Sequence, residues 1–129
     1  MAKVYGTKST EEALKHLLRS RDSNPNDPFI YHAIGLQFYA VRCYKDALKF
    51  FYKAEEIKAG ISSSNSFYLA ECLRKTGNAE QSIEYYKKAL SIPAFNKVDR
   101  KGLDESRKYL LSHGFTESEL NALSTVRCK

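Results

Sequence analysis

Hydrophobic and small side chains recur at helical spacing between residues 28 and 59. One set has the i, i+3, i+4, i+7 spacing of a single helix face and consists of Tyr31, Ile34, Gly35 and Phe38. A second set, spaced i, i+4, i+7, consists of Ala47, Phe51 and Ala54. Small residues alternate with large ones in both sets, which favours two helices that cross closely. The pattern therefore predicts helices over residues 28–41 and 44–58, joined by a short turn.

The same pattern occurs on both sides of this hairpin. Before it, residues 10–23 are predicted to form a helix that is opened by Thr10, or by Ser9 in a capping box with Glu12. After it, the pattern predicts helices over 63–76 and 79–92, on positions Leu69, Ala70, Leu73, Ser82, Tyr86 and Ala89. Gly77 and Asn78 indicate the turn between these two helices.

The last part of the chain departs from this pattern. Asn96, followed by Asp99, predicts the start of a long helix that reaches about Ser112. His113 and Gly114 are typical of a helix end. Thr116 with Glu119 predicts a second capping box and a short final helix. These two helices are expected to cover the open end of the helical array.

The repeating helix pairs resemble tetratricopeptide repeats, whose period is about 34 residues. This resemblance implies an all-α fold, a right-handed superhelix of antiparallel helix pairs (an α-α solenoid) with C-terminal capping helices. We expect a single domain over residues 1–129. It would consist of a half repeat at 9–27, repeats at 28–60 and 61–95, and capping helices at 96–127. Since the first repeat lacks its first helix, we expect the chain to be part of a longer protein.

The composition and the motifs of the chain argue against several classes of function, beginning with nucleic-acid binding. Charged residues make up 28% of the chain and the net charge is +6, but no concentrated basic tail of the nucleic-acid-binding type is present. No apolar run approaches the roughly 20 residues of a membrane-spanning helix. The histidines and glycines are scattered, without a metal-ligand cluster, a nucleophile–base pair or a phosphate loop. We therefore expect a chain that is not an enzyme, needs no cofactor or metal, binds no nucleic acid and has no membrane segment.

Two surfaces are candidates for partner binding. In tetratricopeptide arrays the first helix of each unit lines a concave groove, and the matching positions here comprise Phe29, His32, Leu36, Tyr39 and Ala40, then Ser64, Phe67, Glu71, Arg74 and Lys75. Such a groove can hold a peptide with hydrophobic anchors, or the chain's own terminal segments can fill it. The positions of the chaperone-type carboxylate clamp hold His32 and Leu36, so that clamp is not supported.

The second candidate is a basic surface on the helix predicted over 44–58. Lys45, Lys49 and Lys53 are spaced by four residues, and together they are called the lysine ridge below. Arg42 precedes it, and Lys87 and Lys88 stand at the corresponding end of the next repeat. Such a ridge attracts acidic partners in a salt-dependent way, although for any single lysine a solvated position on the helix surface is the more ordinary interpretation.

One longer stretch resembles a particular family, the regulator of microtubule dynamics proteins. The resemblance rests on Asp46 to Glu56, on the early proline Pro93, and on the polar helix with Asp99, Glu105, Leu110 and Leu111. It implies a non-enzymatic protein of the cytoplasm, cytoskeleton and spindle that acts in microtubule dynamics and chromosome segregation. Its implied partner is tubulin in microtubules, whose acidic tails suit the lysine ridge. The alternative is a peptide-binding adaptor that uses the groove and has no affinity for microtubules.

Overall fold

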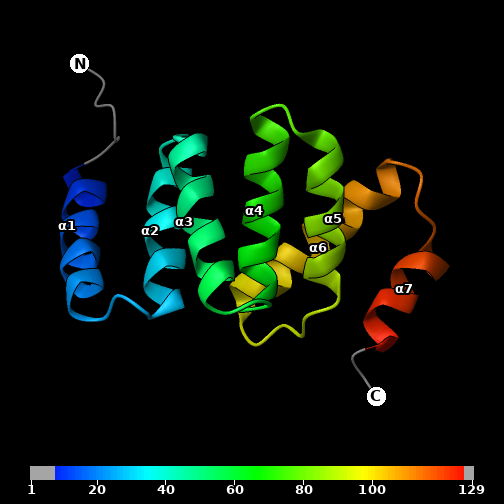
Figure 1. Ribbon diagram of the computed structural model, residues 1–129. Coiled ribbons are helices and arrows are strands. Elements are labelled where there is room, and N and C mark those ends of the chain that lie inside the picture. Colours follow the sequence, from blue (N-terminus) through cyan, green and yellow to red (C-terminus); the bar gives the residue numbers. More distant parts are fainter. Residues whose placement is uncertain (1–7, 127–129) are drawn as a thin grey trace. The chain divides into compact units, whose positions relative to one another are not determined.

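The computed structural model describes residues 8–126, which form seven α-helices and no β-strand within that range (Figure 1). They divide into two compact units, the first ending at Ile61 and the second beginning at Ser62. The all-α prediction is confirmed for the described residues. Helix hairpins of this kind are compatible with an α-solenoid.

The first unit contains α1 (Lys8–Ser23), α2 (Pro28–Ala40) and α3 (Tyr44–Ile57), with α2 packed against both neighbours. Asp27 caps α2 by accepting a hydrogen bond from the Phe29 amide at 3.0 Å, and Pro28 stands in its first turn, where a missing N–H costs nothing. The hydroxyl of Tyr31 donates to the Pro25 carbonyl at 2.9 Å and so ties the α1–α2 turn to α2.

The predicted start of the first helix is corrected by the structure. α1 begins at Lys8, so Ser9 and Thr10 lie inside its first turn and neither is the N-cap residue. The capping-box pattern identified residues that can cap a helix. No proline or glycine lies between Lys8 and Thr10, and helix ends shift easily by one or two residues.

The core of the first unit is apolar and aromatic. Ile34, Ala47, Phe51 and Ala54 are fully buried, and the rings of Tyr31 and Phe38 both stack on Phe50. Gly35 lets α2 and α3 approach closely, because a Cβ atom at this position would lie 2.7 Å from a ring carbon of Phe51. The alternation of small and large residues in the sequence therefore produces the close helix crossing that it predicts.

The second unit contains α4 (Ser63–Lys75), α5 (Ala79–Leu90), α6 (Lys97–Ser112) and α7 (Glu117–Val126). α4 packs against α5 and α6, and α5 also contacts α6 and α7. Its core consists of Phe67, Ala70, Tyr86, Ala89, Leu90, Leu110 and Leu120. Helices α6 and α7 thus contribute core residues to this unit, in addition to covering it.

Both hairpins close with the same hydrogen-bonded turn. The Cys43 amide donates to the Phe38 carbonyl at 2.9 Å, and the Asn78 amide donates to the Leu73 carbonyl at 2.8 Å. The residue before each amide has left-handed backbone geometry, which glycine adopts without strain. Gly77 fills this position in the second hairpin (φ 93°), whereas Arg42 fills it in the first (φ 66°).

Candidate partner-binding surfaces

The lysine ridge lies on α3, and its lysines are exposed. The Lys49 side chain is 77% exposed and lies 3.9 Å from Asp46, while Lys53 lies 3.4 Å from Glu56 on the same helix. The three lysines of α3 are balanced by three acidic residues, so the helix carries no net charge. Such exposed pairs contribute only about 0–1 kcal/mol, so an acidic partner can replace their carboxylates at little cost.

The other predicted basic residues lie in different surroundings. Arg42 is exposed in the α2–α3 turn, next to the ridge in the sequence. In the second unit, the Lys87 ammonium lies 4.8 Å from the centre of the Phe115 ring and that of Lys88 lies 4.9 Å from the centre of the Tyr85 ring. Because both lysines contact aromatic rings within their own unit, part of their charge already contributes to local packing.

In the first unit, the predicted groove residues lie along α2. Phe29 is 54% exposed, and His32, Leu36 and Tyr39 are half-buried. The His32 ring packs against Phe51 with the ring centres 5.7 Å apart. An exposed Phe29 is the side chain of this set that is most available to a partner, while Ala40 at the end of α2 is exposed but small.

In the second unit, α6 covers the matching positions of α4. The Ser64 amide donates to the carboxylate of Asp99 at 3.2 Å. A Cβ atom at Gly102 would lie 3.2 Å from Phe67, so the two helix surfaces are in close contact there. Ser64 and Phe67 are buried as a result, and only Lys75 at the end of α4 is exposed. Here a terminal segment of the chain itself occupies the face that the repeat pattern assigned to a groove.

Glu71 and Arg74, also predicted groove residues, bind each other and a buried tyrosine. The Tyr86 hydroxyl donates to Glu71 at 2.6 Å, Arg74 pairs with Glu71 at 2.8 Å, and the Arg74 Nε donates to the Tyr86 oxygen at 3.1 Å. Burial, and then the hydrogen bond to Glu71, raise the pKa of Tyr86 well above its ordinary value. The Arg74 guanidinium also lies 5.5 Å from the centre of the Tyr109 ring of α6. These two charged groups therefore serve the packing of α4, α5 and α6.

Sequence reasoning missed the role of Asp99 in packing. It lies in the first turn of α6, where its amide donates to the Asn96 side chain at 2.7 Å, which confirms the predicted cap. Its carboxylate also accepts hydrogen bonds from the amides of Ser64 and Phe95, and the residue is only 2% exposed. Gly102 is the feature of the sequence that indicates this packing, since a glycine inside a helix pattern often marks a close contact with another helix.

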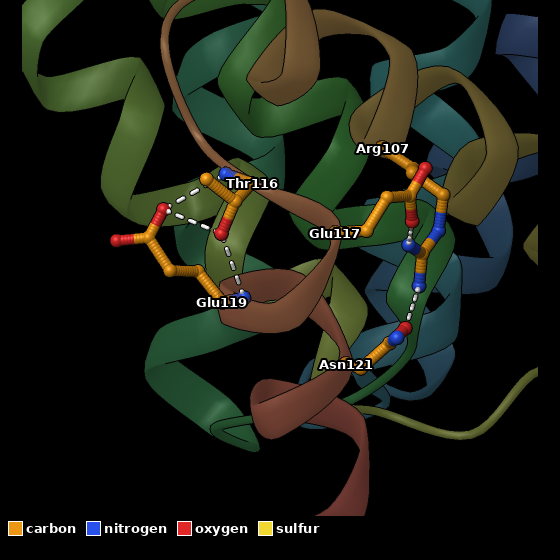
Figure 2. Close-up of polar contacts among 5 residues, drawn as sticks. All are labelled: Arg107, Thr116, Glu117, Glu119 and Asn121. Atoms are coloured by element: carbon orange, nitrogen blue, oxygen red, sulfur yellow. Dashed lines mark hydrogen bonds and ion pairs between the residues drawn. The ribbon is translucent and has the colours of Figure 1, made fainter.

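Helix α7 is held to α6 by polar contacts (Figure 2). The predicted capping box is confirmed: the Glu119 amide donates to the Thr116 hydroxyl at 3.2 Å, and the Thr116 amide donates to Glu119 at 2.8 Å. Figure 2 also shows Arg107 reaching Glu117 at 2.7 Å and Asn121 at 3.4 Å. α7 is therefore fixed both at its start and along its first turns.

Residues 8–126 contain no group of three histidine, cysteine or acidic side chains placed to hold a metal ion. Within the same residues, no helix combines the length and apolar character needed to cross a membrane.

The fold and these surfaces define an all-helical protein built of helix hairpins, and the comparison with known families identifies it further. The family model described as regulator of microtubule dynamics protein 1-3 matches residues 39–114, which is more than half of the chain. The chain belongs to this family. The matched segment runs from the end of α2 to the end of α6 and includes the lysine ridge.

Individual relatives agree with this assignment. Regulator of microtubule dynamics protein 2 of Bos taurus is 25% identical over 114 residues, which cover 73% of this chain and 28% of the relative. The Homo sapiens protein of the same name is 27% identical over 108 residues, which cover 68% of this chain and 26% of the relative. Regulator of microtubule dynamics protein 3 of Bos taurus is 36% identical over 64 residues, which cover 47% of this chain and 14% of the relative. The chain thus spans about a quarter of the length of the protein 2 relatives.

Proposed function

We propose that this chain is a non-enzymatic interaction module of the tetratricopeptide type that binds microtubules. The observation that carries the proposal is the exposed lysine ridge on α3, inside the segment that matches a family named for microtubule dynamics. In the proposed role, the chain acts at the cytoskeleton and spindle of the cytoplasm, in microtubule dynamics and chromosome segregation. Its direct partner is the acidic surface of tubulin.

The mechanism of binding is electrostatic. The intrahelical partners of Lys49 and Lys53 are weakly held, so acidic side chains of tubulin can displace Asp46 and Glu56 from them. Lys45 and Arg42 are exposed beside these lysines in the sequence and add positive charge. Charge complementarity of this kind mainly raises the association rate and weakens with salt.

Charge reversal tests the ridge. A Lys45→Glu, Lys49→Glu variant should bind microtubules on the order of tenfold more weakly in co-sedimentation at low salt, because two attractions become repulsions. The matched control reverses Lys15 and Arg19, which are exposed and also four residues apart on α1, outside the matched segment. Equal losses in both variants would mean that only net charge matters, and unchanged binding in the ridge variant would exclude the ridge.

A second candidate function is a peptide-binding adaptor that uses α2 and has no affinity for microtubules. The observation that favours it is the 54% exposure of Phe29, beside the half-buried His32, Leu36 and Tyr39. An array of synthetic peptides should then contain sequences that bind the chain in a Phe29-dependent way. Phe29→Ala should abolish that binding while circular dichroism shows unchanged helix content; binding that survives the substitution would contradict this function.

A further inference from the structure

The loop between α5 and α6 presents an exposed hydrophobic side chain among cations. Phe95 is 81% exposed, more than any other large hydrophobic residue of the described chain, and Val98 is 48% exposed one turn further on. Lys97, Arg100 and Lys101 surround them in the sequence and are exposed as well. We refer to these five residues as the α5–α6 corner.

Phe95 lacks the intrachain contact that its position usually provides. It stands directly before Asn96, the N-cap of α6. A hydrophobic residue at this position often packs against another at the fourth residue of the helix, in the arrangement called a hydrophobic staple. In this chain that fourth residue is Arg100, so the staple has no apolar partner and the Phe95 ring stays in solvent.

The backbone of the corner is nevertheless fixed. The Phe95 amide donates to the buried carboxylate of Asp99 at 3.1 Å, and Asn96 accepts from the Asp99 amide at 2.7 Å. Asp99 is itself held by the Ser64 amide of α4. An aromatic side chain on an ordered backbone loses little further freedom on binding, and this is typical of residues that dominate the energy of an interface.

The charges around Phe95 select the partner. Within residues 8–126, no ion pair joins Lys97, Arg100 or Lys101 to a carboxylate, unlike Lys49 and Lys53 of the ridge. The carboxylate nearest in the sequence, that of Asp99, is buried and bound to backbone amides. The five residues of the corner therefore carry three positive charges and no negative charge, which complements an acidic partner.

We propose that the α5–α6 corner is a docking site for an acidic protein segment that carries one large hydrophobic residue. The hydrophobic residue covers Phe95 and Val98, and the acidic residues flanking it pair with Lys97, Arg100 and Lys101. This site lies in the second unit and uses none of the lysine-ridge residues, so it does not depend on the microtubule proposal.

The test uses the isotope-labelled 129-residue chain and synthetic peptides in an NMR titration. The probe is the acidic peptide DEDEFDEDE, and its control is DEDEGDEDE, which has the same charge without the anchor. At low salt (~25 mM), the probe should shift amide signals over residues 94–101, and the control should bind about tenfold or more weakly. Equal affinity for both peptides, no binding, or shifts confined to other helices would overturn the proposal.

Variants then separate the two parts of the site. Phe95→Ala should weaken binding of the probe peptide about tenfold or more, whereas Phe95→Leu should retain most of the affinity because it keeps an apolar side chain at this position. Lys97→Glu with Lys101→Glu should weaken binding of the probe peptide by a similar factor. The charge-matched control is Lys15→Glu with Arg19→Glu on α1, which should change the affinity little. A control loss as large as that of the corner variant would overturn the site.

Two other occupants are outcomes of the same experiment. If wild-type chain, but not Phe95→Ala, pellets with phosphatidylserine vesicles while the peptide probe fails to bind, the corner binds membrane surfaces and the proposal is overturned. If sedimentation velocity shows a dimer that Phe95→Ala abolishes, the corner joins two copies of the chain, which also overturns it. A monomer that binds the probe and not the vesicles supports the proposal.

Discussion

The hairpins α2–α3 and α4–α5 align in sequence, yet the same core position holds Phe51 in one and Tyr86 in the other. Phe51 packs against Gly35 in an apolar contact that needs no polar partner. The buried hydroxyl of Tyr86 requires hydrogen bonds, which Glu71 and Arg74 supply. One added oxygen atom in the core thus explains why two charged residues stand where α2 has Leu36 and Tyr39.

The first helices of the two hairpins also differ in what covers them. α6 lies against α4 through Asp99 and Gly102, which buries Ser64 and Phe67. Their counterparts on α2 are Phe29, which is 54% exposed, and His32, which is half-buried. A repeat pattern thus identifies a face of a helix, whereas the availability of that face to a partner depends on which other segments pack on it.

Asp99→Ala should give the largest effect, because it would break the cover of the second hairpin. The substitution leaves the Ser64 and Phe95 amides without their buried acceptor, which should lower the free energy of unfolding by about 3 kcal/mol. Urea unfolding followed by circular dichroism measures this loss. Asp104→Ala, at an exposed position of the same helix, should change stability by less than about 0.5 kcal/mol. Similar values for both variants would contradict the role of Asp99.

Gly35→Ala probes the first hairpin in the same way. The added Cβ would meet the fully buried Phe51 ring at 2.7 Å, so we expect a net loss of about 2 kcal/mol despite the better helix propensity of alanine. Hydrogen exchange should show faster opening of α2 and α3. The reciprocal change Ala70→Gly in α4 should cost only about 1 kcal/mol. If Gly35→Ala left stability unchanged or raised it, α2 and α3 could move apart without loss of stability, which would contradict the need for their close approach.

Tyr86→Phe makes the second hairpin resemble the first. It should lower the free energy of unfolding by about 1 kcal/mol at neutral pH, because the hydrogen bond from Tyr86 to Glu71 is lost while Arg74 still pairs with Glu71.

The pH dependence gives a second test of this substitution. Since the pKa of Tyr86 is raised in the folded state, the unfolded chain loses this proton first above about pH 10, and stability falls as the pH rises further. Below that pH the residue contributes no pH dependence. Tyr86→Phe should reduce the alkaline slope in urea unfolding. It should not abolish the slope, because burial also raises the pKa of Cys72 to about 12. An unchanged slope would contradict this assignment.

Exchanging the turn residues should change the stability of the chain in opposite directions. Arg42→Gly removes a side chain from a left-handed backbone position and should stabilise the chain by about 1 kcal/mol, whereas Gly77→Arg should destabilise it by a similar amount. Thermal unfolding of both variants measures this pair of opposite shifts. Destabilisation by Arg42→Gly would mean that the Arg42 side chain contributes more to the fold than its strained backbone costs.

Much of the fold could be predicted from the sequence because its signals are local. Within residues 8–126, helix periodicity predicts the first five helices, and the capping residues Asn96 and Thr116 predict the last two. The turn at Gly77 is also predicted correctly. The contact of Asp99 with Ser64 joins residues 35 positions apart, and no local pattern encodes it. For the same reason the burial of Phe67 and the exposure of Phe95 could not be read from periodicity. The pairing of Lys49 with Asp46 and of Lys53 with Glu56, by contrast, follows from their three-residue spacing on one helix, which the sequence contains.

The most direct test of the proposed function is co-sedimentation of the wild-type chain with microtubules over a series of salt concentrations. We expect the chain to pellet with microtubules at low ionic strength (~25 mM) and to be progressively released towards ~200 mM, because contacts between exposed charges are screened by salt. A chain that stays in the supernatant even at the lowest salt concentration would contradict the microtubule-binding function.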